Sequence, residues 1–490
     1  MNDAQQRQRI LVAANRGPVS FSRGDSGALT VKRGGGGVVS GLSSVASHSD
    51  MLWVCAALSD ADRAAARRAP DGMFDLDGHP GGSAVRMLDI PPATFNRAYN
   101  TVANSVLWFV HHMLYNTPDR PQFGLAFARD WAAYRSYNLA FAQALAEASG
   151  TGQVRAAIQD YHLTLAPLML REAKPQVRIA HFSHTPWAPF DYYRLLPDDV
   201  AEQVLTGILG ADHAGFLTER WASAFMDCCE RVLGASVDRD RGQVSYAGHR
   251  TGIGVHPLGV NAGELISRAA QADVEDRMAS LRDVIGDRKL IVRVDRTELS
   301  KNILRGLTAY RELLISHPEW RGKVMLLSFA YPSRHDLPEY REYMANVQRL
   351  ASAIDDEFGS ADWSPVLLQT QDDYARSLAG YRLADVLLVN PIRDGMNLVA
   401  KEGPILSDRG CVLVLSREAG AAAELSDHAI MVNPFDVAET AAAMHQALTM
   451  PEAERIRRCQ ALAAAGGAMP PSAWFADQLD ALNALDPLDS

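Results

Sequence analysis

Short runs of Val, Ile and Leu recur along the chain between longer amphipathic segments. Uninterrupted apolar runs of this length are typical of strands covered on both faces of a parallel sheet. The alternation of such runs with helix-like segments predicts an α/β chain with doubly wound sheets. The expected strands lie in 9–15, 51–58, 177–184, 214–218, 289–295, 323–330, 365–370, 384–391, 411–416 and 429–434, and expected helices include 262–284, 300–316 and 338–358.

Glycine and proline interrupt this pattern at GIGVHPLGVN (252–261), which marks a boundary between two domains. We expect Rossmann-like domains over 1–257 and 258–470. The amphipathic segment PSAWFADQLDALNAL predicts a helix, so 471–490 is expected to pack back on the first domain. Sheets of this kind bind ligands beyond the carboxyl ends of their strands, which places the expected site in a cleft between the two domains.

Composition narrows the choice of ligands. Of the 490 residues, 48 are Lys or Arg and 58 are Asp or Glu, a formal charge of −10, which argues against non-specific binding to nucleic acid or an anionic membrane. The five cysteines show no CxxC spacing, so neither a disulfide framework nor a zinc site is expected. The polar first ten residues and the absence of a long apolar stretch predict a cytoplasmic protein. The sequence leaves open whether the chain forms a homo-oligomer.

Four consecutive glycines, Gly34 to Gly37, stand in VKRGGGGVVSGL (31–42). Glycine lets the backbone approach a ligand closely and direct its N–H groups at phosphate oxygens. The spacing is neither GxGxxG nor that of a Walker A motif. A phosphate-binding loop and a flexible surface turn are both compatible with it.

Basic side chains follow several of the expected strands. Arg16, Arg296 and Arg334 each come shortly after such a run, and Lys301 follows Arg296. Because the carboxyl ends of parallel strands meet at one edge of a sheet, these cations can gather around a diphosphate. There they would stabilise the charge that develops on a leaving group. Basic residues at such a spacing are common on any protein surface, so the signal is the recurrence of cations after several strands.

The segment NPIRDGMNLVAKE (390–402) directly follows an expected strand. Asp394 and Gly395 predict a turn, and Asn397 is a good N-cap for a helix over LVAKE. The free N–H groups of that helix start could hold a sugar or a diphosphate, with Glu402 accepting ribose hydroxyls. An ordinary strand–turn–helix joint is the alternative.

Two further motifs are interpreted as structural. Asp75-Leu76-Asp77 resembles a metal-binding DxD pair, but no long apolar strand precedes it, which favours a surface turn. His111 and His112 lie in the apolar segment LWFVHHML and are expected in the core. We therefore expect no metal site and no bound cofactor.

Taken together, RDGMNLVAKE, YNTVANSVLW (99–108), QDYHL (159–163) and CVLVLSREAGAAAEL (411–425) resemble the trehalose-6-phosphate synthases, glycosyltransferase family 20. The resemblance runs through nearly the whole chain. It implies a GT-B fold and the transfer of glucose from a nucleotide-glucose to glucose 6-phosphate with retention. Such families work without metal and without a clear protein nucleophile, so the resemblance implies catalysis by positioning and by stabilisation of the departing diphosphate.

The resemblance also implies roles for individual residues. The implied catalytic residues are Arg296, Lys301, Asp160 and His184. Acceptor binding is implied for Arg16, Tyr99, Trp108, Asp160 and Arg334, with Trp108 and His184 shaping the choice of acceptor and anomer. Donor binding is implied or expected for Gly36, Gly37, Arg296, Lys301, Asp372, Asp373, Asp394, Gly395, Met396, Asn397, Leu398, Val399 and Glu402.

Several departures from the family pattern bear on the substrates. Gln159 replaces the usual His, TELSKN replaces LDYSKG, and HTPWAP (184–189) replaces HIPFP. The segment VDRTELSKN resembles the actinobacterial branch that uses GDP-glucose, and Asp372 or Asp373 could accept both N1–H and N2–H of guanine. GDP-glucose is therefore favoured over UDP-glucose as donor. A pseudoglycosyltransferase of the validoxylamine 7′-phosphate synthase type and a catalytically silent sugar-phosphate sensor remain as alternatives.

Overall fold

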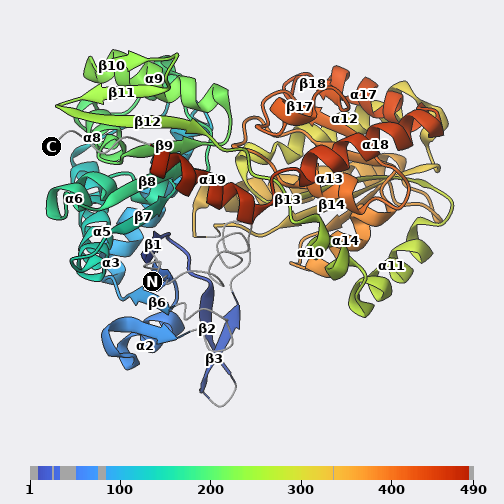
Figure 1. The fold of residues 1–490 in the computed structure, drawn as a ribbon. Helices are drawn as coiled ribbons and strands as arrows, with labels where there is room; N and C mark the ends of the chain where they lie inside the picture. The colour runs from blue at the N-terminus through green and yellow to red at the C-terminus, as the bar shows by residue number, and fades with distance from the viewer. Residues whose placement is uncertain (1–8, 25–26, 34–50, 76–83, 335, 485–490) are drawn as a thin grey trace, which may run out of the picture. The chain divides into compact units, whose positions relative to one another are not determined.

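The computed structural model describes residues 9–24, 27–33, 51–75, 84–334 and 336–484. Its contacts divide the chain into two compact units, which we call unit 1 (Met1–Pro257 with Pro471–Ser490) and unit 2 (Leu258–Pro470). Each unit has a sheet with helices packed against it (Figure 1). None of the described helices is both long and apolar enough to cross a membrane.

The described part of unit 1 contains a ten-stranded sheet. Its central strands run parallel in the order β12-β9-β8-β7-β1-β4-β6, and antiparallel strands extend both edges. The winding reverses between β1 and β7, which is where doubly wound sheets bind ligands. The strands are β1 (Arg9–Ala13), β4 (Met51–Ala56), β5 (Met73–Asp75), β6 (Ala84–Leu88), β7 (Val154–Gln159), β8 (Arg178–Ser183), β9 (His213–Phe216), β10 (Ser236–Asp238), β11 (Gln243–Tyr246) and β12 (His249–Val255).

The described part of unit 1 also contains helices and a separate two-stranded hairpin. The hairpin pairs β2 (Val19–Arg23) with β3 (Leu29–Arg33). The helices are α2 (Asp60–Arg68), α3 (Pro92–Asn96), η2 (Arg97–Leu107), α4 (Trp108–His111), α5 (Leu125–Ser149), α6 (Ala166–Ala173), α7 (Phe190–Tyr193), α8 (Asp198–Leu209), α9 (Glu219–Leu233) and α19 (Pro471–Ala484), with short 3₁₀ turns η1 (Pro70–Gly72) and η3 (Tyr161–Leu163).

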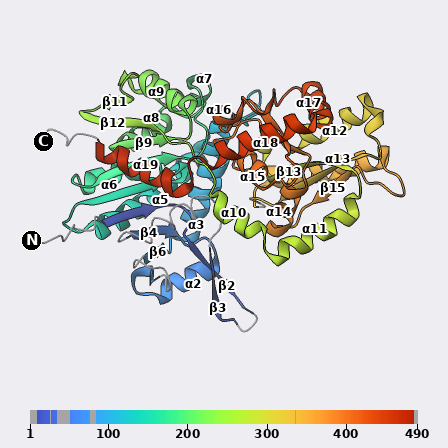
Figure 2. The ribbon, with the colours of Figure 1, turned by 45° about the vertical axis from the view of Figure 1, so that its right-hand side comes forward.

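The C-terminal helix α19 packs on β8 and β9, as Figures 1 and 2 show. Trp474 is fully buried and meets the ring of Phe182 edge-on, with 4.9 Å between ring centroids. Arg178 Nη2 donates to the carbonyl of Leu482 at 2.9 Å. The last described helix is therefore an integral part of unit 1.

Unit 2 contains a six-stranded parallel sheet in its described part, in the order β15-β14-β13-β16-β17-β18. In chain order this is 3-2-1-4-5-6, the order of dinucleotide-binding folds, with the reversal between β13 and β16. Loops that follow these two strands should hold the ligand. The strands are β13 (Lys289–Arg296), β14 (Val324–Tyr331), β15 (Val366–Gln369), β16 (Val386–Val389), β17 (Val412–Ser416) and β18 (Ile430–Val432).

Two of the expected helices in unit 2 have wrong bounds. The segment expected as one helix over 262–284 breaks at Gln271, which is extended (Figure 2), and a second helix then begins with the acidic turn of Asp273 and Glu275. The helix expected from residue 300 begins at Ile303, because Asn302 adopts a left-handed conformation (φ 59°). The helices are α10 (Ala262–Ala269), α11 (Ala272–Ile285), α12 (Ile303–Ser316), α13 (Pro338–Phe358), α14 (Tyr374–Leu383), α15 (Val399–Leu406), α16 (Ala422–Leu425), α17 (Val437–Thr449) and α18 (Glu452–Gly467), with η4 (Leu299–Lys301) and η5 (Pro318–Trp320).

Candidate active site

In unit 1, three of the predicted site residues follow neighbouring strands. Arg16 comes after β1, Asp160 after β7 and His184 after β8. Ala13 pairs with Ile158, and Gln159 with Phe182, so these strands end side by side. The topology therefore brings an exposed guanidinium, a carboxylate and an imidazole to one edge of the sheet, at the reversal of strand order.

Asp160 links the ends of two strands. Its N–H donates to the carbonyl of Phe182 at 2.7 Å, and its Oδ1 accepts the N–H of His184 at 3.1 Å. Its φ of 74° is unusual for a residue other than glycine, and such strain is concentrated at functional sites. The backbone thus holds this carboxylate in a fixed place.

His184 lies largely buried between aromatic rings. Its ring centroid is 4.7 Å from that of Phe182 and 5.4 Å from that of Trp474, and its Nε2 lies 2.9 Å from Gln159 Oε1. Burial lowers the pKa of His184 from 6.5 to about 3. The imidazole is therefore uncharged at neutral pH and does not provide a positive charge at the site.

Tyr99 and Trp108 lie on consecutive helical segments, η2 and α4, and both stack on other rings. Tyr99 lies 5.1 Å from Phe95 and 5.5 Å from His162, centroid to centroid. Trp108 stacks on His112 at 3.8 Å.

His111 and His112 are buried, which confirms their expected place in the core. Asp75 ends the short strand β5, and Leu76 and Asp77 lie outside the described residues.

In unit 2, Lys301 and Asp394 come from the two loops at the reversal between β13 and β16. Lys301 Nζ lies 2.6 Å from Asp394 Oδ2, and both side chains are 16% exposed. Burial by itself lowers the pKa of Lys301, but the carboxylates of Asp394, Asp295 and Glu298 outweigh it and raise the pKa. A permanent cation therefore stands where a doubly wound sheet binds phosphate.

Arg296 is held by a carboxylate that the sequence analysis did not single out. Its Nη2 lies 3.2 Å from Oε1 of Glu298, which also accepts a hydrogen bond from Ser333 Oγ at 3.1 Å. The Glu298 side chain is fully buried while that of Arg296 is 58% exposed. The guanidinium is thus anchored at one end and open to solvent. The available signal was the acid itself, which stands two positions after Arg296 in DRTELSKN.

The loop from Asp394 to Leu398 is clamped by the segment after β17. Gly420 N–H donates to Asp394 O at 3.0 Å, and Ala421 N–H to Met396 O at 2.7 Å. A Cβ on Gly420 would lie 1.8 Å from Gly395 O, so only glycine fits there. Helix α15 begins at Val399, with Leu398 in the cap position, one residue later than predicted. Asn397, with φ 77°, still makes the hydrogen bond expected of a cap, because its Oδ1 accepts the N–H of Ala400 at 3.3 Å.

Glu402 lies one turn into α15 and is half-buried. It accepts a hydrogen bond from Tyr381 Oη at 3.2 Å, and burial raises its pKa.

The two acids expected to contact the base differ in their surroundings. Asp373 caps α14, accepting the N–H of Arg376 at 2.9 Å, and pairs with Arg277 Nε at 2.8 Å. Asp372 beside it is exposed. The carboxylate of Asp373 already has structural partners, so Asp372 is the better candidate for a ligand contact.

Three predicted residues are not among these groups. Arg334 belongs to unit 2, whereas the other predicted acceptor residues belong to unit 1. Its Nη1 donates to Tyr340 Oη at 2.6 Å. Gly36 and Gly37 lie outside the described residues.

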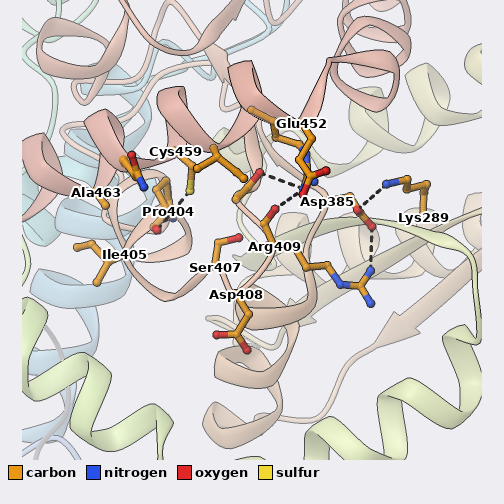
Figure 3. A pocket seen from close by; sticks show the side chains of 14 residues that line it. Lys289, Asp385, Pro404, Ile405, Ser407, Asp408, Arg409, Glu452, Cys459 and Ala463 are labelled. Atoms are coloured by element: carbon orange, nitrogen blue, oxygen red, sulfur yellow. Dashed lines mark hydrogen bonds and ion pairs between the residues drawn. The ribbon is translucent and has the colours of Figure 1, made fainter.

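A cavity of about 740 Å³ opens at the other edge of the unit 2 sheet (Figure 3). It is lined by Lys289, at the start of β13, and by Asp385 and Gly410, just before β16 and β17. Its charges pair with one another: Asp385 accepts from Lys289 at 3.0 Å and from Arg409 at 3.2 Å. None of the predicted site residues lines it, so the cavity is separate from the candidate site.

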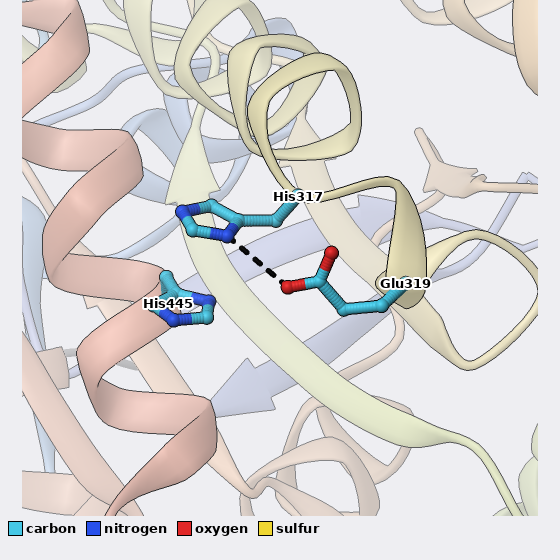
Figure 4. Close-up of side chains that lie close together, drawn as sticks. All are labelled: His317, Glu319 and His445. Carbon is cyan, nitrogen blue, oxygen red and sulfur yellow. Dashed lines mark hydrogen bonds and ion pairs between the residues drawn. The ribbon is translucent and has the colours of Figure 1, made fainter.

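His317, Glu319 and His445 present ligand atoms within 4.8 Å of one another (Figure 4). The two imidazole rings are stacked, 3.6 Å apart and 7° from parallel. Trp320 Nε1 donates to Nδ1 of His445 at 3.1 Å. Nitrogen lone pairs lie in the ring plane, so two stacked rings cannot both point at one ion. This geometry is that of a stacked pair and does not form a chelate.

The model of glycosyltransferase family 20 matches residues 8–484. The chain belongs to glycosyltransferase family 20. This family-20 chain is 34% identical over 462 residues to the alpha,alpha-trehalose-phosphate synthase (UDP-forming) of Schizosaccharomyces pombe, covering 92% of this chain and 86% of the relative. It is 33% identical over 466 residues to a probable synthase of the same name from Arabidopsis thaliana, with 92% and 54% covered, and so spans about half of that relative.

Solved structures of trehalose-phosphate synthases have the same fold as this chain, the GT-B fold. An alpha,alpha-trehalose-phosphate synthase (UDP-forming) from Burkholderia vietnamiensis matches with a TM-score of 0.84 and 28% identity, covering 98% of this chain and 100% of that one. An E. coli protein bound with UDP-2-fluoro glucose matches with a TM-score of 0.85 and 27% identity over the same shares.

Proposed function

We propose that this chain transfers glucose from a nucleotide-glucose to glucose 6-phosphate with retention, giving α,α-trehalose 6-phosphate. The observation that carries the proposal is the Lys301–Asp394 contact, with Arg296 nearby, at the reversal of strand order in unit 2. It is supported by relatives named as trehalose-phosphate synthases and by the E. coli structure bound with UDP-2-fluoro glucose.

Unit 2 is proposed to bind the donor. Arg296 and Lys301 neutralise the diphosphate, and the N–H groups at the start of α15, from Leu398 and Val399, add hydrogen-bond donors. Glu402 accepts the ribose hydroxyls. The remaining proposed contacts are made by the glycine loop with Gly36 and Gly37, and by Asp394, Gly395, Met396 and Asn397 around the glucose and phosphates.

Unit 1 is proposed to bind most of the acceptor. Arg16 binds the phosphate, Tyr99 and Trp108 bind the sugar face, and Asp160 accepts from the sugar hydroxyls. Arg334 of unit 2 is proposed to add a second cation for the acceptor phosphate. The positive φ of Asp160 supports its role, because it fixes the carboxylate before the substrate arrives.

In the proposed reaction the anomeric hydroxyl of glucose 6-phosphate attacks the anomeric carbon of the donor. Attack comes from the face that the diphosphate leaves, so the new glycosidic bond keeps the α configuration. The departing phosphate oxygen takes the proton of the attacking hydroxyl. Arg296 and Lys301 stabilise the charge on the leaving diphosphate, and the uncharged His184 shapes the acceptor pocket. No metal is required, so turnover should persist in excess chelator.

GDP-glucose is proposed as the preferred donor. The exposed carboxylate of Asp372 can accept both N1–H and N2–H of guanine, whereas uracil offers a single N–H between two carbonyl oxygens. UDP-glucose is the second candidate, because the compared relatives are named UDP-forming. Comparing kcat/KM for the two donors decides between them, and equal or better use of UDP-glucose would refute the preference.

A matrix of donors and acceptors tests the activity itself. The expected result is release of nucleoside diphosphate only when glucose 6-phosphate is present. Reaction with a cyclitol phosphate instead would indicate a pseudoglycosyltransferase. Binding of glucose 6-phosphate without any nucleotide release would indicate a silent sensor.

A further inference from the structure

A fully buried arginine lies beneath the turn that carries Lys301. Arg293 is in the middle of β13 and is 0% exposed. Its Nε and Nη2 lie 3.1 Å and 2.7 Å from Oδ2 of Asp295. Burying a charge is costly unless it is well paired, and an apolar residue is the usual occupant of a central strand. The position of this cation therefore calls for an explanation.

The guanidinium also holds the backbone of Lys301. Nη2 of Arg293 donates to the carbonyl oxygen of Lys301 at 3.1 Å. The next residue, Asn302, is left-handed, and its Nδ2 donates to the carbonyls of Asn390 at 2.9 Å and Pro434 at 2.8 Å. The turn is thus fixed on both sides of the peptide unit that precedes α12, while the Lys301 ammonium faces Asp394.

Helix α12 leaves a notch for this side chain. A Cβ on Gly306 would lie 2.0 Å from Nη1 of Arg293, well inside contact distance. Glycine weakens a helix interior, and alanine is the residue that helices favour most there. Glycine at this position is therefore explained by the space that the guanidinium requires. The guanidinium of Arg293 thus occupies the space that the missing side chain of Gly306 leaves on α12.

We propose that Arg293 is a positioning residue for the donor site: it fixes the Lys301 turn so that the ammonium is held where the diphosphate binds. The inference deepens the proposed function and rests on it. A purely structural arginine would affect folding stability alone. A positioning arginine affects binding of a nucleoside diphosphate while leaving acceptor binding unchanged, because most of the proposed acceptor residues lie in unit 1.

The first test is Arg293→Lys in the full chain. Lysine keeps the charge but, as a point charge, cannot bridge Asp295 and the Lys301 carbonyl as the planar guanidinium does. We expect affinity for GDP and UDP, measured by calorimetry, to fall about tenfold, and kcat to fall about 10²-fold, the usual effect of an ångström-scale displacement. Affinity for glucose 6-phosphate should stay within twofold. Arg311→Lys is the matched control, since Arg311 pairs with Glu357 on the exposed side of α12.

A folded Arg293→Lys protein with normal diphosphate affinity and normal kcat would overturn the inference. Failure of the proposed function looks different: the wild-type chain itself would then release no nucleotide from any donor. The two failures are distinguishable because the first is read from the variant and the second from the wild type.

A second variant, Gly306→Ala, tests the same inference if the Arg293→Lys protein does not fold. Gly306→Ala adds one methyl group in the notch and favours the helix, so the displaced guanidinium is its main consequence. We expect the same selective loss of diphosphate affinity, with glucose 6-phosphate affinity within twofold of wild type, and a lower thermal midpoint because the displaced guanidinium loses part of its pairing. In Arg293→Met with Gly306→Ala, the clash disappears but donor binding should stay weak. Normal donor binding by Gly306→Ala would contradict the inference.

Discussion

The contact between Lys301 and Asp394 can be tested by removing each charge in turn. Both side chains are 16% exposed. The pair is therefore neither fully buried nor at the open surface, where ion pairs contribute little to stability. Lys301→Met removes the ammonium from the Asp394 carboxylate, which also accepts a hydrogen bond from Asn397 Nδ2 at 3.2 Å, and we expect a loss of about 2–3 kcal/mol in the free energy of unfolding. If Lys301 also stabilises the leaving diphosphate, kcat should fall about 10²–10³-fold, or roughly 3–4 kcal/mol in activation free energy.

The double variant Lys301→Met with Asp394→Asn separates these two effects. It removes both charges, so stability should return to within about 1 kcal/mol of wild type, while the loss of activity should remain. Unfolding in urea gives the stability, and nucleotide release at saturating donor and acceptor gives kcat. Recovery of kcat in the double variant, or less than a threefold loss in Lys301→Met, would refute the assigned role of Lys301.

Three further predictions concern other parts of the chain. Burial lowers the pKa of His184 from 6.5 to about 3 in the folded chain. Below pH 6.5 the unfolded chain therefore binds a proton at this residue that the folded chain does not bind. The free energy of unfolding should then fall by up to about 1.4 kcal/mol for each pH unit. His184→Gln should therefore lose less stability than wild type between pH 6.5 and 5, and an unchanged pH dependence would show that His184 is not the group responsible. Asp372→Asn should lower kcat/KM for GDP-glucose about tenfold relative to UDP-glucose, while the exposed Asp356→Asn on α13 should not; an unchanged donor ratio would exclude a base contact. Trp474→Ala should cost about 3–5 kcal/mol in unfolding free energy, since the indole is fully buried against Phe182, and a loss below 1 kcal/mol would show that α19 contributes little to unit 1.

The sequence predicted the strands of unit 2 well because they are uninterrupted apolar runs, but in unit 1 it missed β2, β3, β5, β6, β7, β10, β11 and β12. Each of the ten expected runs overlaps a strand. Strand β7 was not among them, since its sequence VRAAIQ carries two alanines and a charge that dilute the apolar signal. The antiparallel edge strands β10 and β11 were also missed, because their alternating residues face solvent on one side.

Site features that depend on conformation were harder to predict. Asn302 and Asn397 both take positive φ, which moves the start of each following helix away from the position that propensity favours. The roles of Glu298 and Gly420 depend on contacts made far along the chain, with Ser333 and with Gly395. Arg293 did have a visible signal, a charge in the apolar run IVRVD, but only the fold shows that it reaches Lys301.

Product analysis tests the central claim most directly. The purified chain is incubated with glucose 6-phosphate and either GDP-glucose or UDP-glucose, and the sugar product is examined by NMR at its anomeric centres. The account predicts one equivalent of nucleoside diphosphate and a disaccharide phosphate in which both anomeric centres are α. A β-configured product, or nucleotide release that does not depend on glucose 6-phosphate, would contradict it.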